Sequence, residues 1–140
     1  MGAEYYLAID VGATKTLLAI FDDKGEVICE EKFPTDKDYE KFKADLASCV
    51  AKLSKFEVKA CCAAFPGLLD LKNGVGLAFG NEDWVNKPLL KDMEVIMPGT
   101  KVFLHNDAKL AGLSEALLLI EKYQRVLYLT LSTGVGGGVI

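Results

Sequence analysis

The stretch LAIDVGATKTLLAIF, residues 7–21, decides the fold, because two apolar runs flank a polar loop that contains glycine. Short apolar runs bounded by turn residues are typical of buried β-strands. The loop between them, residues 10–16, is short enough to join two antiparallel neighbours. The stretch therefore predicts a β-hairpin whose loop is either a plain turn or a cradle for phosphate.

The segments around this hairpin predict an α/β domain with the element order βββαβ. Apolar residues recur at helical spacing, with charged residues between them, over residues 36–54. Thr35 and Asp38 resemble a capping box at the start of this helix. The first three strands are expected to form an antiparallel meander. Strands are expected at residues 5–10, 16–21, 27–33 and 58–65.

The second half of the chain predicts shorter elements. A hairpin is expected at residues 68–79, and a segment that is irregular apart from a short helix at residues 88–93 follows it. Residues 101–105 predict another strand, and Asn106 and Asp107 open a further helix. The apolar positions of that helix include Leu110, Leu113, Leu117 and Ile120.

The C-terminal segment resembles a restart of the N-terminal strand–loop–strand unit. Residues 125–132 predict a strand that leads into a run rich in glycine, and Gly134 of this run aligns with Gly12. Such an internal repeat predicts a second lobe. We therefore expect residues 1–122 to form an N-terminal lobe and residues 123–140 to be the truncated start of a C-terminal lobe.

Composition and charge exclude several classes of protein. The chain has 140 residues, 51% of them hydrophobic, and a formal net charge of −4, which predicts a globular domain without the basic surface that nucleic-acid binding needs. No apolar run approaches the roughly 20 residues that span a bilayer, so we expect no membrane partner. The cysteines lack metal-ligand spacing and are expected to be reduced thiols, which agrees with the cytoplasmic location that we expect. They are Cys29, Cys49, Cys61 and Cys62.

The loop at residues 10–16 suits phosphate by residue type. Gly12 and Ala13 allow the backbone to come close to an anion, and Lys15 supplies positive charge. Asp10 fits beside a phosphate only where Mg²⁺ or its bound water lies between them, so it indicates a complex of metal and nucleotide. Hydroxyl and amide donors come from Thr14 and Thr16.

The second loop strengthens this interpretation. For the first loop alone, a solvated hairpin turn is the simpler explanation, because short turns with glycine are common. The run that follows Leu131 has more glycine than a turn needs, and such runs usually mark a close approach to the backbone. Two loops of this kind, one at the start of each lobe, are expected to face one another and hold one polyphosphate.

Five motifs in order and spacing resemble the amino-terminal half of the ROK sugar kinases. They are the loop at residues 10–16, Phe65-Pro66-Gly67, Asn81 ahead of Trp84, Asn106-Asp107-Ala108, and the serine-, threonine- and glycine-rich run at residues 132–138. The resemblance covers essentially the whole chain. It implies an α/β fold, the RNase H-like lobe of the actin, Hsp70 and hexokinase type, which agrees with the element order expected from the residues.

The resemblance also implies an activity, namely ATP-dependent phosphorylation of a hexose hydroxyl, as in glucokinases, with ATP and Mg²⁺ as cofactors. A hexose or hexose derivative is the expected substrate. Because the zinc-binding cluster of many ROK proteins lies in the second lobe, we expect no zinc site in this chain. A homodimer is the expected assembly, and this N-terminal fragment is expected to be inactive alone. Asp107 matches the family's catalytic base, and the resemblance also gives it a role in substrate binding. The resemblance assigns substrate binding to Gly67, Asn81 and Asn106, and the ATP phosphates to Asp10, Gly12, Thr14, Lys15, Ser132, Thr133 and Gly134.

Two other functions stay open at this point. A sugar-sensing ROK transcriptional regulator normally carries a helix-turn-helix segment first, for which the residues before Tyr5 leave no room. A non-catalytic actin-like binding domain gives no reason for the Asn106-Asp107 pair. One departure concerns the family pattern N-D-A-N, because Lys109 stands at its last position. His105 is expected to point away from Asn106, and Trp84 is expected to pack rather than stack on a sugar.

Overall fold

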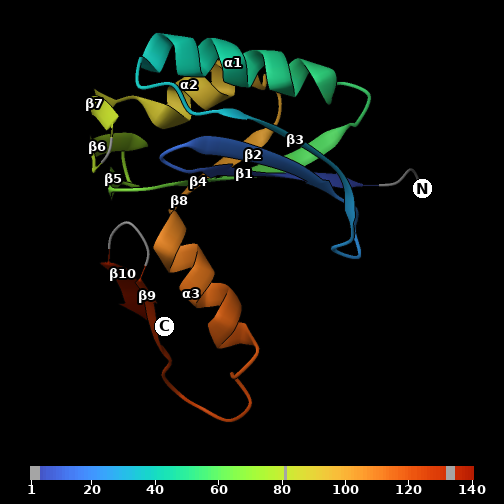
Figure 1. Cartoon of the computed structure of the whole chain (residues 1–140). Coiled ribbons are helices and arrows are strands. Elements are labelled where there is room, and N and C mark those ends of the chain that lie inside the picture. Colours follow the sequence, from blue (N-terminus) through green and yellow to red (C-terminus); the bar gives the residue numbers. More distant parts are fainter. Residues whose placement is uncertain (1–3, 81, 132–134) are drawn as a thin grey trace.

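The computed structural model describes residues 4–80, 82–131 and 135–140. Its centre is a five-stranded sheet in the order β3-β2-β1-β4-β8, shown in Figure 1. β1 and β2 are antiparallel, as are β2 and β3, whereas β4 and β8 run parallel to β1. The predicted hairpin and meander are confirmed. The strands are β1 (Tyr5–Val11), β2 (Lys15–Phe21), β3 (Val27–Pro34), β4 (Val58–Phe65) and β8 (Lys101–Asn106).

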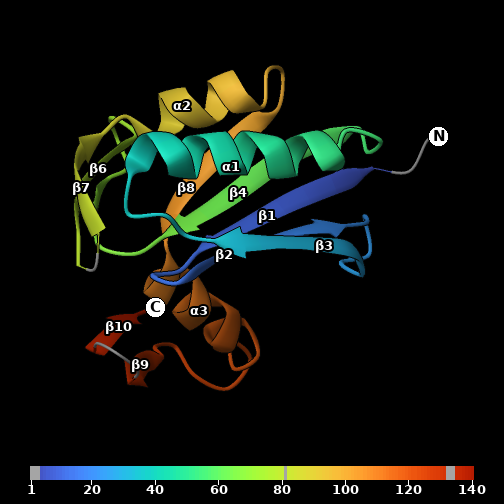
Figure 2. The same cartoon turned by 45° about the horizontal axis from the view of Figure 1, so that its top comes forward.

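Two helices cover one face of this sheet, whereas the C-terminal helix and hairpin lie beyond the other face. Figures 1 and 2 show α1 (Tyr39–Lys52) and α2 (Leu89–Ile96) side by side on the covered face. Past the end of β8, α3 (Asp107–Leu117) leads away from the sheet to the hairpin of β9 (Leu127–Leu131) and β10 (Val135–Val139). No helix within the described residues is long and apolar enough to cross a membrane.

The core lies between the sheet and α1. Alternate residues of β1, β2 and β4 face the helix, and Phe42 and Leu46 of α1 pack on them with no exposed surface. An aromatic cluster closes the end of this core near a small three-stranded sheet. The buried strand residues include Leu7, Ile9, Val11, Leu18, Ile20, Cys61, Ala63 and Phe65.

The small sheet contains a strand that the sequence pattern does not predict. It pairs β5 (Leu68–Asp70), β6 (Val75–Phe79) and β7 (Glu82–Lys87) in that order. The hairpin of β5 and β6 is confirmed, and the predicted short helix is confirmed as α2. The prediction that the residues before this helix are irregular is wrong, because they form β7, which pairs with β6. Trp84 lies in β7 and is only 1% exposed, so the prediction that it packs is confirmed.

Helix α1 begins later than predicted, because its N-cap is Asp38. The Asp38 carboxylate accepts hydrogen bonds from the backbone N–H groups of Glu40 and Lys41, at 2.9 and 3.2 Å. Two of the amides at the helix start are thereby satisfied. The predicted capping role of Thr35 is wrong, since Thr35 contacts the loop between β1 and β2 instead.

The glycine-rich run also differs from the prediction. Residues 135–139 are strand β10 rather than loop, paired with β9 in unbroken register from Val135 opposite Leu131 to Val139 opposite Leu127. Helix α3 packs against this hairpin, and its buried residues are small ones, Gly112 and Ala116, whereas Leu113 and Leu117 are exposed. A side chain at Gly112 would press on Tyr128, so glycine lets β9 come close.

Candidate functional site

The predicted site residues gather where the parallel strands β1, β4 and β8 end. Asp10 lies opposite Ala64 of β4, and Ala64 lies opposite His105 of β8, so all three share one row of the sheet. Asn106 ends β8 and Asp107 begins α3. The carboxyl ends of parallel strands are the usual place for ligand sites in α/β sheets. Sheet pairing therefore brings together residues that are far apart in the sequence.

Asp10 and Asp107 are electrostatic neighbours. Burial of the carboxylate raises the pKa of Asp10 above its ordinary value, and the charge of Asp107 raises it further, while Lys15 acts in the opposite direction. Two carboxylates close together repel one another. A cation between them, or close to both, would relieve this repulsion.

The donor set at this position fits Mg²⁺. Carboxylate oxygen is the ligand that this ion prefers, and Mg²⁺ in nucleotide sites usually keeps several waters and takes phosphate oxygens as well. Within the described residues, no group of three or more histidine, cysteine or acidic side chains is arranged to hold a metal. Asp10, with Asp107 near it, would therefore hold Mg²⁺ only together with water and phosphate.

The loop between β1 and β2 presents three exposed residues: Ala13, Thr14 and Lys15. It closes through the backbone N–H of Gly12, which donates to the carbonyl oxygen of Lys15 at 3.0 Å. A Cβ at Gly12 would lie 3.0 Å from that same oxygen, so a larger residue would press on the closing bond. The exposed tip thus presents the Lys15 ammonium, the Thr14 hydroxyl and the backbone of Ala13.

Thr16 does not share this exposure. Its side chain is fully buried, and its hydroxyl lies 2.9 Å from that of Thr35. This burial disfavours the prediction that Thr16 offers its hydroxyl to phosphate. The side chain forms part of the base of the loop and not of its exposed tip.

Asn106 and Gly67 are in direct contact. The Asn106 Nδ2 donates to the carbonyl oxygen of Gly67 at 3.1 Å, while its Oδ1 accepts from the N–H of Lys109 at 3.1 Å and so caps α3. Gly67 has a φ of 87°, and a Cβ there would overlap the carbonyl oxygen of Ala78. The amide of Asn106 is fixed at both ends, and each end keeps the capacity for one more hydrogen bond.

Asp107 occupies the first turn of α3. Its Oδ1 accepts a hydrogen bond from the N–H of Ala108 at 2.7 Å, the one bond that its carboxylate makes among the described residues. The positive end of the helix dipole favours a negative charge at this place. The side chain is half-buried at the mouth of the site. Asp107 is thus placed to accept a further hydrogen bond from a ligand.

Several predicted residues lie outside the described residues. They are Asn81 in the sugar-side segment and Ser132, Thr133 and Gly134 in the second loop. The strand after that loop is described, and it lies against the start of α3: a Cβ at Gly136 would meet the Cβ of Ala108 at 3.1 Å. The absence of a side chain at Gly136 therefore allows β10 to approach the residue that follows Asp107.

Two residues support the site through contacts that the sequence did not predict. Thr35 contacts the β1–β2 loop, and Trp84 donates from its indole Nε1 to the carbonyl oxygen of Lys37 at 2.7 Å. Both contacts fall on the segment between β3 and α1. The signal available for Thr35 was a threonine just after a strand, which equally suits a helix cap. Only the tertiary contact separates the two roles.

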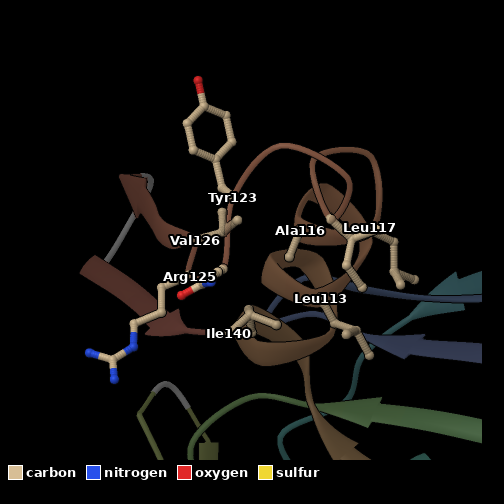
Figure 3. A pocket seen from close by; sticks show the side chains of 9 residues that line it. Leu113, Ala116, Leu117, Tyr123, Arg125, Val126 and Ile140 are labelled. Carbon is tan, nitrogen blue, oxygen red and sulfur yellow. The ribbon is translucent and has the colours of Figure 1, made fainter.

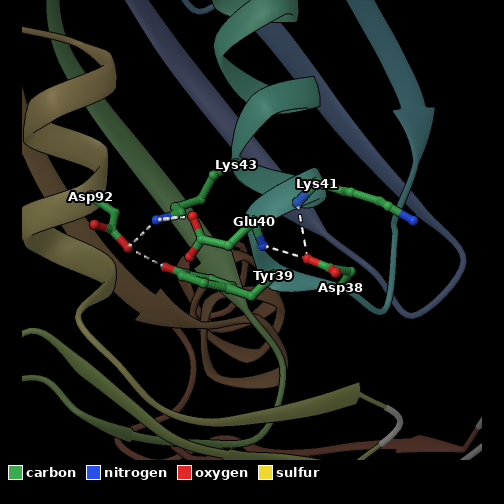
Figure 4. A network of polar contacts seen from close by, with 6 residues as sticks. All are labelled: Asp38, Tyr39, Glu40, Lys41, Lys43 and Asp92. Atoms are coloured by element: carbon green, nitrogen blue, oxygen red, sulfur yellow. Dashed lines mark hydrogen bonds and ion pairs between the residues drawn. The ribbon is translucent and has the colours of Figure 1, made fainter.

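A polar network joins the start of α1 to α2. Figure 4 shows the Tyr39 hydroxyl donating to Asp92 of α2 at 2.8 Å, with Lys43 between Asp92 and Glu40. Burial and the bond to Asp92 raise the pKa of Tyr39, so its hydroxyl keeps its proton. The network joins α1 to α2 and presents no cleft, so its role is structural.

Two cavities within the described residues lie away from these site residues. One, of about 110 Å³, lies between the far end of α3 and the C-terminal hairpin, where Leu113, Leu117 and Ile140 line it (Figure 3). At 1.5 Å of rise per residue, Leu113 is about 9 Å along the helix from Asp107. The other, of about 330 Å³, lies near the ends of α1 and α2. Neither belongs to the candidate site.

Comparisons with known proteins agree on one family. A profile described as the ROK family matches residues 6–140. An N-acetyl-D-glucosamine kinase of Haemophilus influenzae is 35% identical over 139 residues, covering 96% of this chain and 45% of that relative. The chain therefore spans about half the length of the curated relatives it matches.

Solved structures show the same fold. The ROK hexokinase of Thermus thermophilus is 31% identical, with a TM-score of 0.77 over 97% of this chain and 46% of that one. A ROK family glucokinase of Streptomyces griseus, solved with glucose and AMPPNP, is 28% identical, with a TM-score of 0.81 over 99% of this chain and 44% of that one. The predicted α/β lobe is confirmed.

Proposed function

Because the chain belongs to the ROK family, we propose that it forms the nucleotide-facing and sugar-facing lobe of an ATP-dependent sugar kinase. The observation that carries this proposal is the meeting of Asp10, Asn106 and Asp107 at the ends of the parallel strands, with the exposed loop of Lys15 beside them. Residues 1–122 make up this lobe, and residues 123–140 begin a second one that completes the cleft.

The proposed substrate is a hexose or a hexose derivative. Relatives of this chain include N-acetyl-D-glucosamine kinases, and a structural relative was solved with glucose. Asn106 and Gly67 lie on the sugar side, next to the small sheet of β5, β6 and β7. N-acetylglucosamine and glucose are therefore the first sugars to compare, and the active protein is proposed to be a homodimer.

The mechanism follows from the placement of the carboxylates. Phosphoryl transfer requires a sugar hydroxyl to be held in line with the γ-phosphate and its proton to be accepted. Asp107, half-buried at the start of α3, is proposed to orient that hydroxyl and to take the proton. Mg²⁺, when bound, neutralises charge on the phosphate oxygens. Asp10 would hold that ion through water, and Lys15 and the backbone of Gly12, Ala13 and Thr14 would contact phosphate.

The experiment that tests this proposal is a sugar-dependent ADP-release assay on the full-length gene product. Asp107→Asn keeps the size of the side chain and removes its ability to accept a proton. We expect kcat to fall by about 10²–10⁴-fold, as is typical when a general base is lost, with sugar affinity retained. Glu115→Gln, an exposed carboxylate farther along α3, is the matched control and should leave kcat unchanged.

Two results would contradict the proposal. Unchanged turnover in Asp107→Asn would remove Asp107 from the role of base. A wild-type protein that binds hexoses but releases no ADP with any of them would favour a sugar-sensing role over a kinase.

A further inference from the structure

Thr35 contacts the β1–β2 loop twice. Its backbone N–H donates to the carbonyl oxygen of Thr14 at 3.1 Å, and its hydroxyl lies 2.9 Å from the hydroxyl of Thr16. The residue before it, Pro34, is paired with Lys15 at the end of the β2–β3 ladder. Thr35 therefore carries the pairing of β3 one step further, onto the loop itself.

The contact between the two hydroxyl groups satisfies a buried polar group. Among the described residues, Thr16 is the one polar or charged residue that is buried, and it has no exposed surface. Buried hydroxyl groups almost always have a hydrogen-bond partner, because an unpaired one loses its water without replacement. The Thr35 hydroxyl is the side-chain partner of the Thr16 hydroxyl. The base of the loop thus depends on one residue from outside the hairpin.

The segment that follows Thr35 is held by contacts of its own. The carbonyl oxygen of Lys37, two residues on, accepts the indole N–H of Trp84 at 2.7 Å, and Trp84 is buried among Tyr39, Phe42 and Phe79. Asp38 then caps α1, as Figure 4 shows. The segment from Thr35 to Asp38 therefore joins the loop to the small sheet on the sugar side. A fixed anchor of this kind transmits its position to the loop.

We propose that Thr35 is a positioning residue for the nucleotide loop, holding residues 12–16 in the conformation that receives the phosphates. This inference rests on the proposed kinase function. Thr35 lies at the base of the loop, so it acts through Thr14 and Thr16 and not by contact with the reacting groups. Small displacements of groups that position a substrate reduce rates strongly, about 10²-fold for 1 Å. Loss of the Thr35 hydroxyl is therefore expected to weaken the use of the nucleotide and to leave binding of the sugar unchanged.

The test uses three variants of the full-length gene product. Thr35→Val keeps the branched shape and the backbone N–H but removes the hydroxyl, whereas Thr35→Ser keeps the hydroxyl. Thr100→Val makes the same chemical change in the turn after α2, away from the site. We expect Thr35→Val to lower kcat/KM for ATP by about 10-fold or more, with KM for the sugar within about twofold of wild type. Thr35→Ser should restore most of the loss, and Thr100→Val should match wild type.

A second measurement follows the loop without turnover. Hydrogen exchange of the backbone amides at residues 12–16, in the absence of ligands, should be faster in Thr35→Val than in wild type and unchanged in Thr100→Val. Unchanged exchange in Thr35→Val would overturn the inference, whether or not the protein is a kinase. Equal losses for ATP and sugar would also overturn it, because they would indicate general destabilisation. A wild-type protein without kinase activity would refute the proposed function, and exchange alone would then decide the role of Thr35.

Discussion

Substitution of Gly67 by alanine tests how tightly the sugar side of the site is built. Gly67 has a φ of 87°, and a Cβ there would overlap the Ala78 carbonyl oxygen and lie 3.0 Å from the Cα of Phe79. Both neighbours are backbone, so no side chain can rotate away. The turn after β4 would have to move, and with it the carbonyl oxygen of Gly67 that accepts from Asn106.

Gly99→Ala is the matched control. Gly99 has a φ of 82°, close to that of Gly67, but nothing lies within 4 Å of the position its Cβ would take. An alanine in this left-handed conformation destabilises the folded state by about 1–2 kcal/mol. The lower entropy of the unfolded chain offsets about 0.4–1 kcal/mol of this loss. We therefore expect a net loss of about 1 kcal/mol for Gly99→Ala.

Gly67→Ala should lose more free energy of unfolding than Gly99→Ala, because its Cβ overlaps the backbone and because the resulting shift breaks contacts. The bond from Asn106 contributes about 1 kcal/mol, and disturbed pairing of Leu68 with Ala78 contributes a similar amount. The expected total is about 3 kcal/mol, or about 2 kcal/mol more than the control. With a urea m-value of about 2 kcal/mol/M, the unfolding midpoint of Gly67→Ala should lie about 1 M below that of Gly99→Ala.

The assay is urea unfolding followed by tryptophan fluorescence. The described chain holds a single tryptophan, Trp84, whose ring centre lies 5.3 Å from that of Phe79, next to the disturbed turn. Equal midpoints for the two variants would refute the argument, because the overlap would then cost nothing. If the proposed function is correct, Gly67→Ala should also raise the KM for the sugar, while Gly99→Ala should not.

Two further predictions concern Asp10 and Trp84. Because burial and Asp107 raise the native pKa of Asp10, the folded state binds more protons than the unfolded state between the two pKa values, and stability falls as the pH rises through this window. Asp10→Asn should therefore have a larger free energy of unfolding than wild type at neutral pH in EDTA. Urea titrations should show this difference vanishing as the pH falls below about 4, the pKa of the unfolded state. A difference that persists below that pH would contradict the electrostatic cause. Trp84→Phe removes the donor to Lys37 and leaves a smaller ring in the core, so thermal or urea unfolding should show a loss of about 2–4 kcal/mol, whereas a loss below about 1 kcal/mol would contradict it.

Much of the fold could be predicted because local sequence carries it. The alternating burial of β1 and the hairpin loop follow from the spacing of apolar and turn residues, and the order βββαβ follows from the same pattern. Strand β7 could not be predicted in this way. Its existence depends on pairing with β6 and on a core that accepts Trp84, and neither is visible in the spacing of residues 82–87.

The glycine-rich run at the C-terminus shows the same limit. Glycine indicates that something comes close to the backbone, but the sequence does not say what. In the structure, the neighbours of Gly136 and Gly137 are Ala108 of α3 and the backbone of β9. Packing of the hairpin against α3 therefore explains Gly136, and the close approach of β9 explains Gly137. The phosphate contacts predicted for this run belong to residues 132–134, outside the described part of the chain.

The sequence by itself determined which residue types were available at the site: a carboxylate and a lysine around one turn, and an Asn-Asp pair at a helix start. Tertiary structure alone decided that Asp10 and Asp107 are neighbours, that Thr16 is buried, and that Thr35 holds the loop instead of capping α1. The physical reason is the range of the interactions. Turns and caps depend on a few adjacent residues, whereas the meeting of two carboxylates depends on the parallel pairing of β1, β4 and β8, which joins segments distant in the chain.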